Sequence, residues 1–125
     1  MPRSINVPGL AHNAPIPVGA RVANVLCSSA IAGRHPATGR LPSDPIDQAR
    51  LAFDNLKLFL DAGGATLADV VKLTVYVKDD SVREHINAQW LACWPDPAQR
   101  PARHIVVHDL QHGMALQLET LAVVA

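Results

Sequence analysis

The sequence predicts one α+β domain spanning residues 1–125, in which a mixed β-sheet is backed by two helices on one face. The first observation is the order of the expected elements, which runs strand, helix, strand, helix, strand, strand. The second is that a β-branched strand at residues 70–80 separates two amphipathic helices, which fits helices packed on one face of a sheet. No repeat, linker or change in composition indicates a second domain.

The chain before the first helix is expected to supply an arm, a strand region and a loop. Residues 1–19 are rich in Pro, Gly and Asn and predict an irregular arm. Residues 20–33 begin with apolar alternation and predict one strand, or two strands around a turn at residues 22–24. Residues 34–44 contain two prolines and the turn pairs Thr-Gly and Ser-Asp, so we expect a loop.

The first helix is predicted to begin after Asp44, a good N-cap, with Pro45 at its first position. Apolar residues then recur at helical spacing and form a stripe that would face the sheet. This stripe consists of Ile46, Ala49, Phe53, Leu56 and Leu60, widened by Ala52 and Phe59. Gly63 and Gly64 end the helix, and residues 66–69 form a short link to the next strand.

The second half of the chain is expected to contain three strands and one helix. The strand at residues 70–80 places Leu73, Val75 and Val77 on one face. A capping box made by Ser81 and Glu84 predicts the start of the second helix, and Pro95 ends it. The apolar stripe of this helix consists of Val82, Ile86, Trp90 and Cys93. After a loop at residues 95–102, we expect strands at residues 103–108 and 114–124, joined by a turn.

Composition argues against several classes of protein. Eleven basic and eleven acidic residues cancel, so a dedicated nucleic-acid surface is not expected. No apolar stretch reaches the roughly 18 residues that span a membrane, and the N-terminus lacks an apolar signal core, so we expect a cytoplasmic protein. Cys27 and Cys93 lie among apolar residues and are expected to be buried thiols. His104, His108 and His112 are evenly spaced, but nothing completes a ligand set, and no metal is expected.

Three polar residues near the C-terminus interrupt a stretch that otherwise has the composition of a core. Arg103 follows a Pro-Ala pair and precedes an apolar run, while Gln117 and Glu119 share one face of the last predicted strand. These side chains could form the solvated face of a sheet, or they could belong to a binding site. No glycine-rich phosphate loop and no nucleophile with an evident base beside it is present.

Five stretches occur in a characteristic order along the chain. They are SSAIAGRHPATGRLP at residues 28–42, QARLAFDNLKLFLDAGGATLADVVKLTVYVKD at 48–79, INAQW at 86–90, RPARHIVV at 100–107 and LQLETLAV at 116–123. Together they resemble the reactive intermediate deaminase family, called RidA or YjgF. The resemblance implies a chorismate mutase-like mixed sheet backed by two helices, and a homotrimer with clefts between subunits. It also implies hydrolysis of enamines and imines of 2-oxo acids, with release of ammonia and no cofactor.

The resemblance implies a role for several residues. Arg103 falls on the family's carboxylate-binding arginine, and Ser29 and Asn87 fall on residues that line the cleft. Gln117 stands where the family has the glutamate that handles water, and the family's second glutamate is kept as Glu119, which we expect to be structural.

Other positions also depart from the family pattern. Ala30 and Ile31 stand where the family has a loop glycine and glutamine, and Ile105 where a cysteine often follows the arginine by two. Ile16 stands in place of an N-terminal tyrosine that reaches the cleft. The isoleucines at positions 16 and 31 would make the cleft less polar.

Two hypotheses follow. The first is a RidA-like hydrolase acting on a small carboxylate-bearing metabolite, in which Arg103 holds the carboxylate and Gln117 orients water. The second is a non-catalytic trimer that binds a 2-oxo acid, because a glutamine amide can hold a water but cannot accept its proton. RNA cleavage, an activity that has also been ascribed to the family, is the weakest hypothesis for a chain of zero net charge. A histidine could replace the missing base, and the candidates are His12, His104 and His108.

Overall fold

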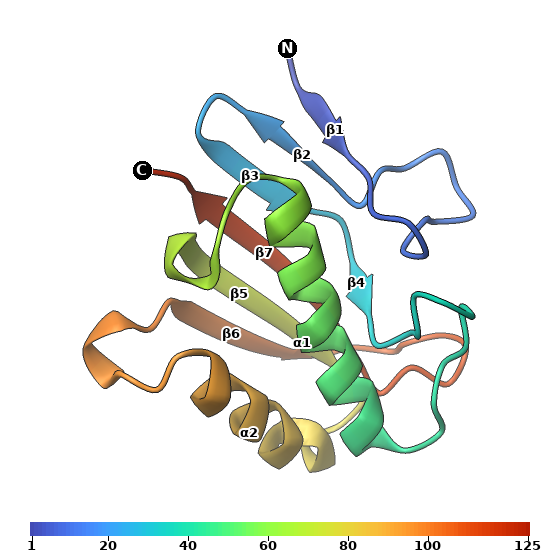
Figure 1. The fold of residues 1–125 in the computed structure, drawn as a ribbon. Coiled ribbons are helices and arrows are strands. Elements are labelled where there is room, and N and C mark those ends of the chain that lie inside the picture. The colour runs from blue at the N-terminus through green and yellow to red at the C-terminus, as the bar shows by residue number, and fades with distance from the viewer.

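The computed structural model describes residues 1–125 as one mixed β-sheet with both helices on one of its faces (Figure 1). The strands are β1 (Arg3–Ile5), β2 (Gly19–Val22), β3 (Val25–Ser28), β4 (Ile31–Ala32), β5 (Val70–Val77), β6 (Ala102–Val107) and β7 (Leu116–Val123); the helices are α1 (Pro45–Ala62) and α2 (Arg83–Cys93). The sheet order is β1-β2-β3-β7-β5-β6, with β4 pairing to β7. Only β5 and β6 run parallel. The predicted α+β class and the placement of both helices on one face are confirmed.

Helix α1 forms where its caps and apolar stripe predicted it. The Asp44 carboxylate accepts a hydrogen bond from the backbone N–H of Ile46 at 2.9 Å, and Gly64, with φ of +80°, follows the last turn. The predicted stripe is buried against the sheet, except for Ile46, which is 53% exposed. Ile46 lies in the first turn of α1, where no other element covers it.

The start of α2 differs from the prediction. Asp79, and not Ser81, makes the cap, and it caps a short 3-10 turn, Asp80–Val82, that precedes the helix at Arg83. The Asp79 carboxylate accepts hydrogen bonds from both the backbone N–H and the hydroxyl of Ser81. Ser81 lies inside this 3-10 turn, the N-cap position of α2 is Val82, and no side chain caps the helix, so the predicted Ser81–Glu84 capping box is wrong.

The N-terminal segment contains more sheet than predicted. Residues 3–5 form β1, which pairs antiparallel with β2, and Ile5 is buried in the core. The alternative of two strands around a turn is confirmed for β2 and β3, which meet at Ala23 with a φ of +51°. The short strand β4 follows them. Irregular coil remains between β1 and β2.

The pleat of the sheet gives it two different faces. Leu73, Val75 and Val77 of β5 point toward the helices and are at most 1% exposed, as predicted. The opposite face is not covered by any element of the chain (Figure 1). Cys27 lies in register with Leu121 on that open face and is exposed, so the prediction of a buried thiol is wrong there.

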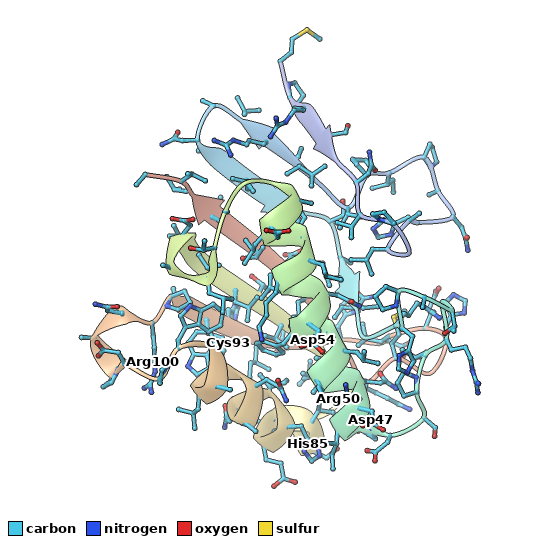
Figure 2. The ribbon with its side chains drawn as sticks, viewed as in Figure 1. Asp47, Arg50, Asp54, His85, Cys93 and Arg100 are labelled. Atoms are coloured by element: carbon cyan, nitrogen blue, oxygen red, sulfur yellow. The ribbon has the colours of Figure 1, made fainter.

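Cys93 lies between the two helices and is half-buried, facing Asp54 of α1 (Figure 2). Burial raises the pKa of its thiol. No helix in the structure has the length and apolar character required to cross a membrane.

Candidate functional site

A cavity with a volume of about 610 Å³ lies where four loops and strand ends meet beside β7. The N-terminal arm contributes residues 9–13, the chain around β4 contributes residues 30–34, and the turn before β7 contributes His112 and Met114. Gln117 of β7 completes the polar part of the lining. No aspartate or glutamate lines the cavity, and its charged or titratable residues are His12, Arg34 and His112.

Two buried amides of α1 hold the walls of this cavity. The Gln48 side-chain amide donates to the carbonyls of Pro42 at 2.8 Å and Gly113 at 3.2 Å, and its carbonyl accepts from the N–H of Ala115 at 2.8 Å. The Asn55 amide donates to the carbonyls of two residues of the β4 region at 2.9 Å each. Since both side chains are almost fully buried, α1 fixes loops that are distant in sequence.

The predicted residues around β4 and β7 divide between the two faces of the sheet. Gln117 lies in register with Ala32 and Tyr76, is half-buried, and directs its amide N–H to the Met114 sulfur at 3.3 Å. Ala30 lines the cavity and is exposed. Ile31 borders the same cavity, but it is in register with buried Leu118 and is only 3% exposed, so most of its side chain belongs to the core.

Ser29 and Ile16 lie outside the cavity lining. The Ser29 hydroxyl donates to the carbonyl of Pro17 at 2.9 Å, and its N–H donates to the carbonyl of Val18 at 2.8 Å. These bonds fasten the N-terminal arm to the end of β3. Ile16 lies on the arm and is 50% exposed.

Arg103 lies at the other end of the sheet order, on the edge strand β6. Its guanidinium stacks over the Trp90 ring of α2 at 4.9 Å, and its Nη1 is buried without a hydrogen-bond partner. Burial lowers the pKa of Arg103, and the positive charge of Arg83 adds to that effect. Arg83, Asn87 and Trp90 recur at positions i, i+4 and i+7, so one face of α2 carries all three. Asn87 is half-buried.

Arg103 and Gln117 point to opposite faces of the sheet. Arg103 is in register with Leu73, which faces the helices, whereas Gln117 is in register with Tyr76, which faces away from them. Neighbours in register share a face. The two side chains therefore do not meet within one chain. The structure brings together Gln117, Ala30 and His12 in one place, and Arg103 and Asn87 in another.

Glu119 lies on the open face next to Gln117 along β7, but it does not line the large cavity. It accepts a hydrogen bond from the Tyr76 hydroxyl at 3.0 Å, and this bond raises the pKa of the tyrosine. His104 is in register with Thr74 on the same face, and His108 packs edge-on against Tyr76. Neither histidine lines the cavity.

Sequence reasoning did not identify Arg34 and His112 as cavity residues. They come from two separate loops, and although Arg34 lies within the 28–42 stretch, no pattern in the sequence distinguishes either side chain. Tertiary contacts made by Gln48 and Asn55 bring these loops together. No group of three or more His, Cys, Asp or Glu side chains in the structure is arranged to hold a metal ion.

Comparison with known proteins identifies the family. The model described as Endoribonuclease L-PSP matches residues 14–124. The chain is 35% identical over 119 residues to the 2-iminobutanoate/2-iminopropanoate deaminase of Escherichia coli, covering 90% of this chain and 93% of that protein. It is 34% identical over 90 residues to the putative reactive intermediate deaminase TdcF of the same species, covering 70% of each chain.

Solved structures give the same result. RidA from the Antarctic bacterium Psychrobacter sp. superposes with a TM-score of 0.90 at 27% identity, covering 98% of this chain and 99% of that one. The YjgF gene product of E. coli superposes with a TM-score of 0.87 at 31% identity, covering 97% and 98% of the two chains. The protein therefore belongs to the RidA/YjgF family.

Proposed function

We propose that this protein hydrolyses imines or enamines of 2-oxo acids, releasing ammonia, in clefts shared between copies of the chain. The observation that carries the proposal is the environment of Arg103. Its Nη1 is buried and unpaired, and no carboxylate of the chain forms an ion pair with it. A guanidinium held in this way can receive a substrate carboxylate through two parallel hydrogen bonds. The names of the deaminase relatives support the same substrate class.

A shared cleft accounts for the distribution of the site residues. Arg103 and Gln117 occupy opposite faces of one sheet, so a single copy cannot offer both to one small molecule. A cyclic oligomer solves this problem, because each cleft takes one group from each of two neighbours. We propose a homotrimer, with the open face of the sheet turned toward the other copies. That face includes apolar side chains such as Val25, Leu121 and Val123.

The roles within the cleft follow from chemistry. Arg103 of one copy holds the carboxylate, and the Gln117 amide of a neighbour holds the attacking water. Asn87, beside Arg103, and Ser29, at the end of β3, orient the substrate. Ile16 and Ala30 border it with apolar surface, together with the exposed edge of Ile31. Imine hydrolysis needs only water and proton transfers, so we propose that no cofactor takes part. We also propose that the protein works in the cytoplasm.

The test measures ammonia release from freshly generated 2-iminopropanoate and from a bulkier imino acid, each supplied by an amino-acid oxidase. Arg103→Ala is expected to reduce kcat/KM about 100-fold, since it removes charge-assisted hydrogen bonds. Arg103→Lys keeps the positive charge but loses the two parallel N–H donors of the guanidinium. Its kcat/KM is therefore expected to stay below that of the wild type. Arg50→Ala is the matched control, because Arg50 pairs only with Asp47 on the surface of α1 (Figure 2). Equal rates for the wild type and Arg103→Ala would refute the proposal.

The alternative function is a trimer that binds a 2-oxo acid without turning it over. Gln117 favours this alternative, because its amide cannot accept a proton. Calorimetry with pyruvate would then show binding that Arg103→Ala abolishes, while the wild type leaves the rate of ammonia release unchanged. Under this alternative, Gln117→Glu would create the activity.

A further inference from the structure

The proposed reaction requires a proton acceptor that Gln117 cannot provide. No aspartate or glutamate lines the cavity around it. Arg34 lines the cavity but stays protonated in proteins and can only donate. The remaining titratable residues of the lining are His12 and His112. A histidine is a suitable acceptor, since its neutral ring binds a proton through the free lone pair of one nitrogen.

His12 has the ring nitrogen that is available for this task. Its Nε2 is buried and has no hydrogen-bond partner within the chain. A buried polar atom left unpaired costs free energy, so such an atom in a cavity is suited to a ligand or a water. The side chain as a whole is half-buried and lines the cavity.

The arm that carries His12 is held in place. Gly9, with a φ of +85°, lies so close to the 34–44 loop that an added Cβ would be 2.0 Å from the carbonyl oxygen of Pro36. The N–H of Leu10 donates to the carbonyl of Val7, which is buried in the core. These contacts place residues 9–13 along one wall of the cavity.

The other histidines are less suited to the role. His112 is exposed and lies in a tight turn with a φ of +61°. The Nδ1 atom of His108 lies 2.8 Å from the carbonyl oxygen of Asp109, and its ring packs on Tyr76. His104 is on the open face and lies outside the lining.

We propose that His12 is the general base of this site, a catalytic role that rests on the hydrolase function proposed above. The water held by Gln117 adds its oxygen to the carbon of the iminium ion, and the C=N π electrons move to nitrogen. His12 Nε2 takes the proton released by the water and then returns it to the amino nitrogen. The C–N bond breaks as the hydroxyl oxygen forms the C=O bond, and the hydroxyl proton goes to the departing ammonia. Iminium ion and water thus yield 2-oxo acid and ammonium.

The test compares His12→Gln with the wild type in the ammonia-release assay. Glutamine can still donate a hydrogen bond but cannot accept the proton. We expect kcat to fall about 10²–10⁴-fold, with little change in the affinity for pyruvate. The double variant with Gln117→Glu should regain activity, because a carboxylate then replaces the base.

His85→Gln is the matched control, because His85 lies on α2 beside Glu84 and outside the cavity lining (Figure 2). The inference is overturned if His12→Gln keeps the wild-type kcat while Arg103→Ala loses it, and in that case the hydrolase function stands. It is also overturned if His12→Gln is slow and the double variant with Gln117→Glu is equally slow, since the histidine would then have a structural role. If the wild type itself releases no ammonia faster than the uncatalysed reaction, the hydrolase function fails and this inference fails with it.

Discussion

Gln48 connects the fold to the cavity, and its replacement by alanine should have a large effect on stability. The side chain is 1% exposed and makes three hydrogen bonds, to Pro42, Gly113 and Ala115. A hydrogen bond contributes about 1 kcal/mol net, so the three together contribute about 3 kcal/mol. The N–H of Ala115 stays buried in the variant and loses its acceptor, which keeps the expected loss at or above this value. Gln48→Ala should therefore reduce the free energy of unfolding by about 3 kcal/mol.

Urea unfolding at one fixed protein concentration measures this loss, because oligomer assembly makes apparent stability depend on concentration. Gln111→Ala is the matched control, since Gln111 is exposed in the same turn region and its side chain makes no hydrogen bond in the structure. The control should stay within about 0.5 kcal/mol of the wild type. A loss below about 1 kcal/mol for Gln48→Ala would show that its three bonds do not fix the cavity walls.

Three further predictions concern local features. Asp44→Ala removes the α1 cap and should reduce the free energy of unfolding by about 1 kcal/mol in a urea titration. Hydrogen bonds from Ser81 lower the pKa of Asp79. The contribution of Asp79 to stability is therefore present at pH values above the ordinary pKa of aspartate, and it is lost as the pH falls through the lowered pKa. Asp79→Asn should flatten that part of a curve of unfolding free energy against pH. Gly9→Ala forces a contact with the Pro36 carbonyl and should reduce activity more than stability, because it displaces the arm that lines the cavity; an unchanged kcat would contradict this.

Local sequence patterns predicted the parts of the fold that depend on one element at a time. The alternation in β5 places Leu73, Val75 and Val77 on the core face, and one N-cap with one apolar stripe predicts α1. The patterns failed where contacts with another segment of the chain decide the local structure. Strand β1 has three residues and no alternation, and it forms because β2 offers a free edge. Ser81 does not cap α2 because it lies inside the 3-10 turn that Asp79 caps, one residue before the helix N-cap Val82.

Local sequence patterns were also insufficient to place the residues of the candidate site. The sequence indicates that Arg103 and Gln117 are unusual, but it does not indicate which face of the sheet each would occupy. Strand register decides this, and register depends on how β5 pairs with β6 on one side and β7 on the other. His12 is similar, because its position against the cavity depends on an irregular arm whose path no periodicity describes.

The two-face geometry of Arg103 and Gln117 leads to a complementation experiment. If each cleft takes Arg103 from one copy and Gln117 from its neighbour, Arg103→Ala and Gln117→Ala protomers can restore each other. In an equimolar mixture that is unfolded and reassembled at random, about a quarter of the clefts contain both native residues, so about a quarter of the wild-type ammonia release should return.

Gln117→Ala mixed with His12→Gln is the control for this exchange, because those two residues line one cavity of the same chain. No cleft in that mixture regains both groups, so the activity should stay at the level of the separate variants. If the Arg103→Ala and Gln117→Ala mixture also stays at that level although exchange has occurred, a cleft shared in this way is refuted. The uncovered face of the sheet would then need another explanation, since Arg103 and Gln117 cannot serve one small substrate within a single copy.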